Sequence, residues 1–387
     1  MSKTSSISLY LFLEDITLDG GCERVVVNMA NEFSKLYQNV HIVSNFQSND
    51  KIKFEIDESV KINFIHPCLS LEKWKSNHSL KFLFKSGIFY KLFLSIGFTT
   101  KLYEYILKNR TKDDTPIVLF HGYDTAWYKK KNIKLIGVDH SNFPFYKNDS
   151  FFYRNIKFPL ISFMNRKLDI VTILTDAEIK YWKKLNRPVH IIPNFIPNIP
   201  EIIPSAADRN KTLISMGRMN TDQKGFDRLI KGFAKISNKF PDWKLIIYGD
   251  GKFKNEYQRL IDNYKLKGKV QLENFTENPY EVFSENSIYV MCSRTEGFGL
   301  VLAEAMACGM AAVSYENTGP NSIIRDNNNG YLIPNGDEAM LCNKLEQLMT
   351  NLDLRVKFST NGRIDILNRY SAHTIISKWN EIFQLIA

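Results

Sequence analysis

Two carboxylates, Glu296 and Glu304, lie on either side of a glycine-rich turn in the second half of the chain. The turn, residues 296–299 (EGFG), leads directly into 300–308, a stretch rich in helix formers that ends at Gly309. Unpaired backbone N–H groups and the helix dipole make such a helix start favourable for an anion, typically a phosphate. Carboxylates repel phosphate, so we expect them to hold an uncharged, hydroxyl-rich group attached to it. The alternative is a surface helix that carries two glutamates by chance.

Two cations lie in a loop that follows an apolar run at 212–216. Arg218 comes directly after Gly217, and Lys224 follows six residues later, before Gly225. Arg and Lys side chains at one site can neutralise a pyrophosphate. Taken alone, however, the pair is better explained as solvated side chains of an exposed loop.

The first half of the chain has three candidate positions at the ends of apolar runs. Gly20-Gly21 is a turn that lets a ligand approach the backbone closely. His121 follows 117–120, and His140 follows 135–138. Polar residues at the carboxyl ends of parallel strands face the ligand crevice of an α/β sheet. A tight turn or a single histidine is also common as a purely structural feature.

Alternating apolar strands and amphipathic helices are predicted to position these residues. The fold class is therefore α/β, with two doubly wound, Rossmann-like domains facing each other across a cleft. The expected domains are 1–195, a linker at 196–211 rich in proline and small residues, 212–368, and a helix at 369–387. The predicted strands are 7–13, 40–44, 117–120, 135–138, 171–174, 190–192, 212–216, 244–248, 270–273 and 287–291, and the predicted helices include 226–236, 253–264 and 371–385.

Composition excludes several classes of protein. The net charge is +10, and 28 Lys and Arg against 19 Asp and Glu in residues 1–200 account for most of it. The five cysteines have no CxxC spacing, which argues against a zinc site and a disulfide framework and favours a reducing compartment. No apolar run reaches the roughly 18 residues that span a bilayer. We expect a cytoplasmic protein, with any membrane contact peripheral to the inner face.

Two segments of the first half, 73–110 and 151–167, mix basic and aromatic residues. This pattern is typical of helices that lie on an anionic lipid surface. Nucleic-acid binding is less favoured, because no recognition module accompanies the charge. An equally good interpretation is that the aromatic residues form the core of the first domain and the lysines its wet face.

Taken together, these features resemble the retaining glycosyltransferases of family 4, which have the two-domain GT-B fold. The resemblance covers almost the whole chain and is strongest from 215 to 336. One departure is Ser322, which stands where many members have an acid before two isoleucines. The residues that carry the resemblance are the E-x7-E pair Glu296 and Glu304, Gly217-Arg218 with Lys224-Gly225, Gly20-Gly21 with Glu23, His140, and Ile192-Pro193-Asn194.

The resemblance also implies roles for individual residues. Arg218 and Lys224 would bind the diphosphate of a nucleotide sugar, Glu304 the ribose and Glu296 the donor sugar, while His140 would reach the sugar from the first domain. The expected catalytic residues are thus Glu296, His140, Arg218 and Lys224. The other expected donor-binding residues are Gly21, Gly217, Phe275, Thr276, Gly297, Phe298, Gly299, Leu300 and Glu304.

We therefore expect a hexosyltransferase that uses a nucleotide sugar, with UDP as the favoured nucleotide, and a glycan or glycolipid acceptor. No cofactor and no metal are expected, because two cations already neutralise the leaving diphosphate and the chain has no Asp-x-Asp motif. The alternatives are a transferase that acts on a small soluble acceptor and a non-catalytic subunit that binds nucleotide sugars.

Overall fold

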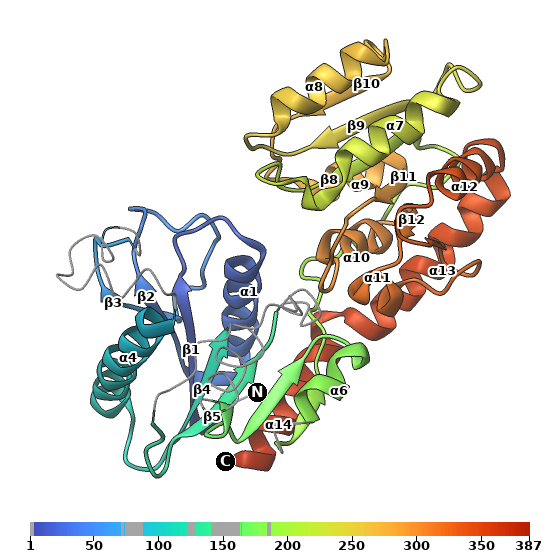
Figure 1. Cartoon of the computed structure of the whole chain (residues 1–387). Coiled ribbons are helices and arrows are strands. Elements are labelled where there is room, and N and C mark those ends of the chain that lie inside the picture. Colours follow the sequence, from blue (N-terminus) through green and yellow to red (C-terminus); the bar gives the residue numbers. More distant parts are fainter. Residues whose placement is uncertain are drawn as a thin grey trace. The chain divides into compact units, whose positions relative to one another are not determined.

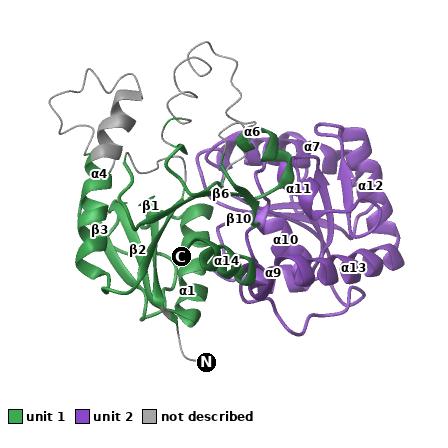
Figure 2. Ribbon diagram, turned by 90° about the horizontal axis from the view of Figure 1, so that it is seen from below, with its two compact units in different colours: residues 1–193, 376–387 green, residues 194–375 purple. Residues whose placement is uncertain are grey.

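A computed structural model describes residues 4–70, 73, 88–121, 128–140, 163, 165–183 and 187–387. The contacts divide the chain into two compact units: unit 1 is residues 1–193 with 376–387, and unit 2 is residues 194–375 (Figure 2). Each unit is built on one parallel β-sheet, which confirms the predicted class of two doubly wound α/β domains.

Unit 1 contains a seven-stranded sheet in the order β3-β2-β1-β4-β5-β6-β7. The order reverses between β1 and β4, so a crevice is expected at the carboxyl ends of these strands. Figure 1 labels most of these elements. The strands are β1 (Thr4–Asp15), β2 (Tyr37–Phe46), β3 (Lys61–His66), β4 (Thr115–His121), β5 (Lys134–Val138), β6 (Ile170–Ile173) and β7 (Val189–Ile191), and the helices are α1 (Gly21–Leu36), α4 (Ile88–Asn109), α6 (Ile179–Trp182) and, from residue 376, α14 (Ala372–Ile386).

The last helix completes unit 1. Trp379 and Phe383 of α14 pack edge-on against Phe33 of α1, with ring centroids 6.2 and 5.3 Å away. The Tyr37 hydroxyl donates a 2.5 Å hydrogen bond to Asn380 Oδ1. The predicted amphipathic helix at 371–385 is confirmed, because Ile375, Trp379, Ile382 and Phe383 are buried in the structure.

Unit 2 contains a six-stranded sheet in the order β10-β9-β8-β11-β12-β13, with its reversal between β8 and β11. Its main core joins α7, α8 and α12 to the sheet. The strands are β8 (Asn210–Met216), β9 (Lys244–Tyr248), β10 (Val270–Glu273), β11 (Asn286–Met291), β12 (Ala311–Tyr315) and β13 (Tyr331–Ile333), and the helices are α7 (Phe226–Ile236), α8 (Lys254–Asn263), α9 (Pro279–Glu285), α10 (Leu300–Ala307), α11 (Thr318–Ile323), α12 (Glu338–Thr350) and α13 (Leu352–Tyr370).

Residues 196–211, which we expected to be a linker, lie within unit 2 by their contacts. Ile196 is buried and its backbone N–H donates to the Tyr370 carbonyl. The buried guanidinium of Arg209 donates to four backbone carbonyls, of which that of Cys308 is 2.6 Å away. A buried arginine fixed by several acceptors holds its segment to the domain, so this stretch is not an open tether.

The basic and aromatic segments of unit 1 lie largely outside the described residues, including 74–87 and 151–162. Within the described part, Phe98 of α4 is buried beside Phe12 and Phe46 and belongs to the core. Phe98 therefore fits the interpretation that these aromatic residues are core. None of the described helices combines the length and the apolar character that crossing a lipid bilayer requires.

Candidate functional site

The predicted donor residues of unit 2 follow the two strands at which the sheet order reverses. Gly217 comes directly after β8, and Ser293 follows β11 after one residue. β8 and β11 are neighbours in the sheet, so their carboxyl ends lie side by side. Ligands of open parallel sheets bind at this position, because the loops diverge there and leave room. The topology thus brings the glycine-rich turn and the cationic loop to one edge of the sheet.

Lys224 and Glu296 meet at this edge. The Lys224 ammonium lies 2.7 Å from Glu296 Oε2, and the Ser293 hydroxyl donates to the same oxygen over 3.1 Å. Both side chains of the ion pair are largely covered, with exposed fractions of 22% for Lys224 and 14% for Glu296. A cation and a carboxylate predicted to serve one ligand are therefore in contact.

Two glycines leave room for the Lys224 side chain and for the loop that carries it. A Cβ atom at Gly217 would lie 3.0 Å from Cγ of Lys224, so the lysine stem runs directly over this residue. Gly225 adopts a left-handed backbone with φ +67°, and a Cβ there would lie 2.0 Å from the Cys292 carbonyl oxygen. Only glycine allows this approach of the two loops.

Arg294 joins the two loops, and sequence reasoning missed it. Its backbone N–H donates to the Gln223 carbonyl at 2.7 Å, and its guanidinium binds both oxygens of Asp227 at 2.8 and 2.9 Å. Burial raises the pKa of the Asp227 carboxyl, but the bidentate hydrogen bonds and charge of Arg294 outweigh it, so the pKa lies below its usual range. No local sequence pattern marks this bridge, because Arg294 and Asp227 are 67 residues apart.

The start of α10 has the features expected of an anion site. Gly299 is its N-cap, has a left-handed backbone with φ 89°, and provides no side-chain cap. The first backbone N–H groups of the helix have no acceptor within it. Glu304, one turn further on, is 1% exposed. Burial raises the pKa of Tyr289 on β11, and the negative charges of Glu296 and Glu304 raise it further.

Helix α11 supports the turn from behind. The Gly319 backbone N–H donates to the Glu296 carbonyl at 3.2 Å, and a Cβ at Gly319 would lie 2.1 Å from the Phe298 carbonyl oxygen. The side chain of Phe298 is buried. These contacts fix the backbone of the EGFG turn, and Gly319 opens the run in which Ser322 departs from the family pattern.

Three further predicted residues that the structure describes in unit 2 form no hydrogen bond with this ion pair, and Arg218 is the nearest of them in sequence. Arg218 is exposed and forms no hydrogen bond or ion pair with a residue that the structure describes. Phe275 and Thr276 follow β10, two strands away from β8. The Phe275 backbone N–H donates to Asp250 at 2.8 Å and its side chain is 63% exposed.

The predicted residues of unit 1 also follow neighbouring strands. Gly21 is the first residue of α1, after β1, and a Cβ there would have open space around it. Nδ1 of His121, at the end of β4, lies 2.6 Å from Nε2 of His140, two residues beyond β5. The two imidazole rings are nearly parallel, with centroids 4.9 Å apart and an interplanar angle of 10°. Burial lowers the pKa of His140 to about 4, so the ring is neutral at neutral pH.

Metal ligands do not gather in the part of the chain that the structure covers, where no group of three or more His, Cys, Asp or Glu side chains could hold an ion. All five cysteines are free thiols.

Comparison with protein families assigns both units. Residues 19–198 match the family model described as glycosyltransferase family 4, and residues 199–365 match the one described as glycosyl transferases group 1. An uncharacterized glycosyltransferase of Haemophilus influenzae is 28% identical over 385 residues, which cover 96% of this chain and 98% of the relative.

Two further relatives have named activities. The N-acetylgalactosamine-N,N'-diacetylbacillosaminyl-diphospho-undecaprenol 4-alpha-N-acetylgalactosaminyltransferase of Campylobacter jejuni is 27% identical, with 89% of this chain and 91% of the relative covered. The poly(ribitol-phosphate) alpha-N-acetylglucosaminyltransferase of Staphylococcus aureus is 29% identical, with 65% of this chain and 51% of the relative covered.

Solved structures share the fold over its whole length. A TarM variant of S. aureus in complex with fondaparinux, alpha-GlcNAc-glycerol and UDP superposes with a TM-score of 0.75 at 20% identity, covering 97% of this chain and 99% of that one. Sucrose-phosphate synthase of Thermosynechococcus elongatus gives a TM-score of 0.77 at 18% identity, with coverage of 98% and 99%. With two glycosyltransferase family models matched in tandem over two parallel sheets, the chain belongs to the glycosyltransferases of the GT-B fold.

Proposed function

We propose that this enzyme moves a hexose or N-acetylhexosamine from a nucleotide-diphosphate sugar, with UDP as the nucleotide, to a lipid-linked or lipid-anchored glycan in surface polysaccharide synthesis. The observation that carries the proposal is the meeting of Lys224 and Glu296 beside the uncapped start of α10. A cation and helix N–H groups suit a diphosphate, and a carboxylate suits sugar hydroxyls.

The reaction follows from where charge develops. When the bond between the sugar C1 and the diphosphate oxygen breaks, negative charge grows on the diphosphate, and Lys224, Arg218 and the start of α10 stabilise it. The acceptor oxygen bonds to C1, and its proton passes to the departing diphosphate. Because fixed cations neutralise the leaving group, the enzyme works without a divalent ion.

The C. jejuni and S. aureus relatives support retention of configuration by their names, which specify alpha-linked products. An alpha linkage made from a sugar nucleotide that is itself alpha-configured retains the configuration at C1. The undecaprenol-linked acceptor named for the C. jejuni relative supports a lipid-linked acceptor here.

A panel of UDP-, GDP- and ADP-sugars tests the donor. The true donor at 100 times its dissociation constant should add about 2.7 kcal/mol to the free energy of unfolding. Transfer to an undecaprenyl-diphosphate-linked sugar, with the anomer assigned by NMR coupling constants, then tests the reaction. Binding without turnover would favour the non-catalytic subunit, and a beta product from an alpha donor would exclude retention.

The membrane part of the proposal has its own test. Replacing Lys81, Lys85 and Lys91 by Glu should weaken co-sedimentation with anionic phosphatidylglycerol vesicles, because each lysine near such a surface contributes about 1 kcal/mol. The matched control reverses three exposed lysines of unit 2, Lys244, Lys252 and Lys267. Equal sedimentation of both triple variants would remove the membrane surface as a partner.

A further inference from the structure

Tyr370 is the last residue of α13 and links the glycine-rich turn to the segments by which the chain passes between its units. Its ring packs edge-to-face on Phe298, with centroids 5.4 Å apart and planes at 73°. Tyr370 is 2% exposed and Phe298 3% exposed, so this contact is fully buried. Phe298 belongs to the turn that is expected to receive the donor.

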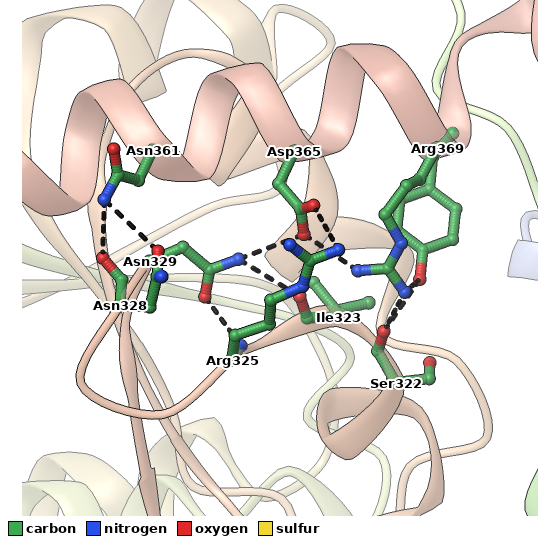
Figure 3. Close-up of polar contacts among 9 residues, drawn as sticks. Ser322, Ile323, Arg325, Asn328, Asn329, Asn361, Asp365 and Arg369 are labelled. Carbon is green, nitrogen blue, oxygen red and sulfur yellow. Dashed lines mark hydrogen bonds and ion pairs between the residues drawn. The ribbon is translucent and has the colours of Figure 1, made fainter.

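Polar contacts hold Tyr370 in this position. Its hydroxyl donates to the Ser322 carbonyl at 2.8 Å and accepts from Arg369 at 2.6 Å. Arg369 in turn binds Asp365, which also pairs with Arg325 at 2.9 Å (Figure 3). Asp365 is thus paired with two arginines, and the Ser322 carbonyl of α11 accepts a hydrogen bond from Tyr370 of α13. Tyr370 contacts the turn directly through the ring of Phe298. It also contacts the turn indirectly, because it binds Ser322 of α11 and Gly319 of the same helix lies against the Phe298 carbonyl.

Both connections between the units run past this residue. The first crossing enters unit 2 at Asn194, and two residues later the Ile196 backbone N–H donates to the Tyr370 carbonyl at 2.9 Å. Ile196 also forms a parallel bridge with Ser371. The second crossing leaves unit 2 at Ile375, in the helix that begins directly after Ser371. The two crossing segments are therefore fastened together at the backbone of Tyr370, while its side chain rests on the donor turn.

We propose that Tyr370 is a positioning residue that couples donor binding in unit 2 to the two segments connecting the units. The inference rests on the proposed function, because it takes the Phe298 turn as the donor site. A nucleotide that orders this turn also orders Phe298, and through the ring of Tyr370 it restrains the backbone at Ile196 and Ser371.

Tyr331 supplies a matched control in the same unit. It is 4% exposed, its ring packs edge-to-face on Phe358 with centroids 4.9 Å apart, and its hydroxyl donates to Gln347 at 2.8 Å. Each tyrosine also has a basic side chain over its ring, Lys344 for Tyr331 and Arg369 for Tyr370. Tyr331→Leu and Tyr370→Leu therefore each remove a buried ring contact and hydroxyl hydrogen bonds, one for Tyr331 and two for Tyr370, but of the two residues Tyr370 alone touches the donor turn.

The first experiment titrates UDP into the full chain by calorimetry, with GDP and ADP as further probes. Tyr370→Leu should weaken nucleotide binding on the order of tenfold, since a misplaced turn loses fixed contacts. Tyr331→Leu should stay within about twofold at a similar loss of melting temperature. Tyr370→Phe keeps the ring on Phe298 and should retain most of the affinity. Equal loss of affinity in the two leucine variants would overturn the inference.

The second experiment is measured first on the wild-type chain. Saturating UDP should slow amide hydrogen exchange in wild-type peptides covering 194–198 and 368–374, and Tyr370→Leu should abolish that slowing. Unchanged exchange in the nucleotide-bound wild type would overturn the coupling even if Tyr370→Leu does not fold. If no nucleotide bound the wild-type chain, both the proposed function and this inference would be wrong. Nucleotide binding with unchanged exchange would contradict the inference alone.

Discussion

At the scale of single residues, a ligand that binds Lys224 has to break the ion pair between Lys224 and Glu296. The two groups are 2.7 Å apart and mostly covered, and Ser293 also donates to the carboxylate. A diphosphate that draws the ammonium away leaves Glu296 with the Ser293 hydroxyl and the sugar hydroxyls of the donor. The ion pair therefore keeps Lys224 and Glu296 in place until the donor binds, and it dissociates on binding.

Lys224→Ala should reduce turnover by roughly 100- to 1000-fold, as does the loss of one fixed donor to a developing anion. The same change should lower the free energy of unfolding by only about 1 to 3 kcal/mol, since it strands one partly buried carboxylate. Steady-state kinetics and urea titration measure the two effects. Lys235→Ala, which breaks an exposed pair with Glu338, is the control and should leave turnover within about twofold. Unchanged turnover in Lys224→Ala would refute its role.

Sequence could indicate the residues of this pair but not those that hold them. Lys224 and Glu296 were identifiable because a loop cation and a glycine-rich turn each have a local pattern. Arg294 and Asp227 carry no such pattern, because what they do depends on two loops about 70 residues apart being neighbours. That Arg218 and His140 touch the same donor stays a prediction.

At the scale of elements, the packing of α11 against the EGFG turn has no spare space. Gly319→Ala would place a Cβ 2.1 Å from the Phe298 carbonyl oxygen, so the helix and the turn must move apart. We expect a loss of about 1 to 3 kcal/mol in stability, as for overpacked cores, together with weaker nucleotide binding. Thermal melts with and without UDP measure both.

Gly232→Ala in α7 is the matched control for this change. Its Cβ would lie 3.3 Å from the flexible end of Leu341, and alanine favours helix. This variant should keep its nucleotide affinity. Similar behaviour of the two variants would mean that α11 does not shape the turn.

Helices and strands were predicted correctly where the buried positions of the element are also its apolar residues. The helix at 226–236 and the strands at 244–248 and 270–273 were predicted to the residue, since their apolar side chains alone mark the buried face. Helix α13 was not predicted, because its buried positions include Ser359, Gly362 and Asp365, which do not register as apolar. The edge strand β3 is half exposed, and β13 has only three residues, so neither gave a signal.

At the scale of the whole molecule, buried histidines are confined to unit 1. Burial lowers the pKa of His41 and His140 to about 4 and that of His121 well below its ordinary value. These rings stay neutral in the folded state but accept protons on unfolding once the pH is below their ordinary value of 6.5. Protonation of these histidines in the unfolded chain therefore lowers the free energy of unfolding as the pH falls from about 6.5 towards 4. In unit 2, Asp227 and Asp250 have lowered pKa values, so their contribution is lost only below about their ordinary value of 3.8.

We therefore expect unit 1 to lose stability between pH 7 and pH 5 while unit 2 keeps it. Urea titrations read by hydrogen exchange in peptides from β1 and β8 measure the two units separately. His41→Gln removes one of the titrating groups and should flatten the dependence of unit 1. Parallel loss in both units would contradict this assignment.

The architecture of the whole molecule was largely predictable. Two series of alternating strands and helices with a proline-rich stretch between them predict two doubly wound units, and the structure confirms them. The attachment of 196–211 to unit 2 was not predictable, because it depends on Arg209 reaching carbonyls that are up to 99 residues away.

The return of α14 to unit 1 sets an order of events during synthesis. A ribosome makes most of unit 1 first, then all of unit 2, and only afterwards the residues from Ile376 that cover Phe33 and Tyr37. The nascent first unit must therefore wait, with an aromatic patch uncovered, until translation of its last segment. A stop codon before that of Ile376 would thus damage the half of the enzyme that was translated earliest.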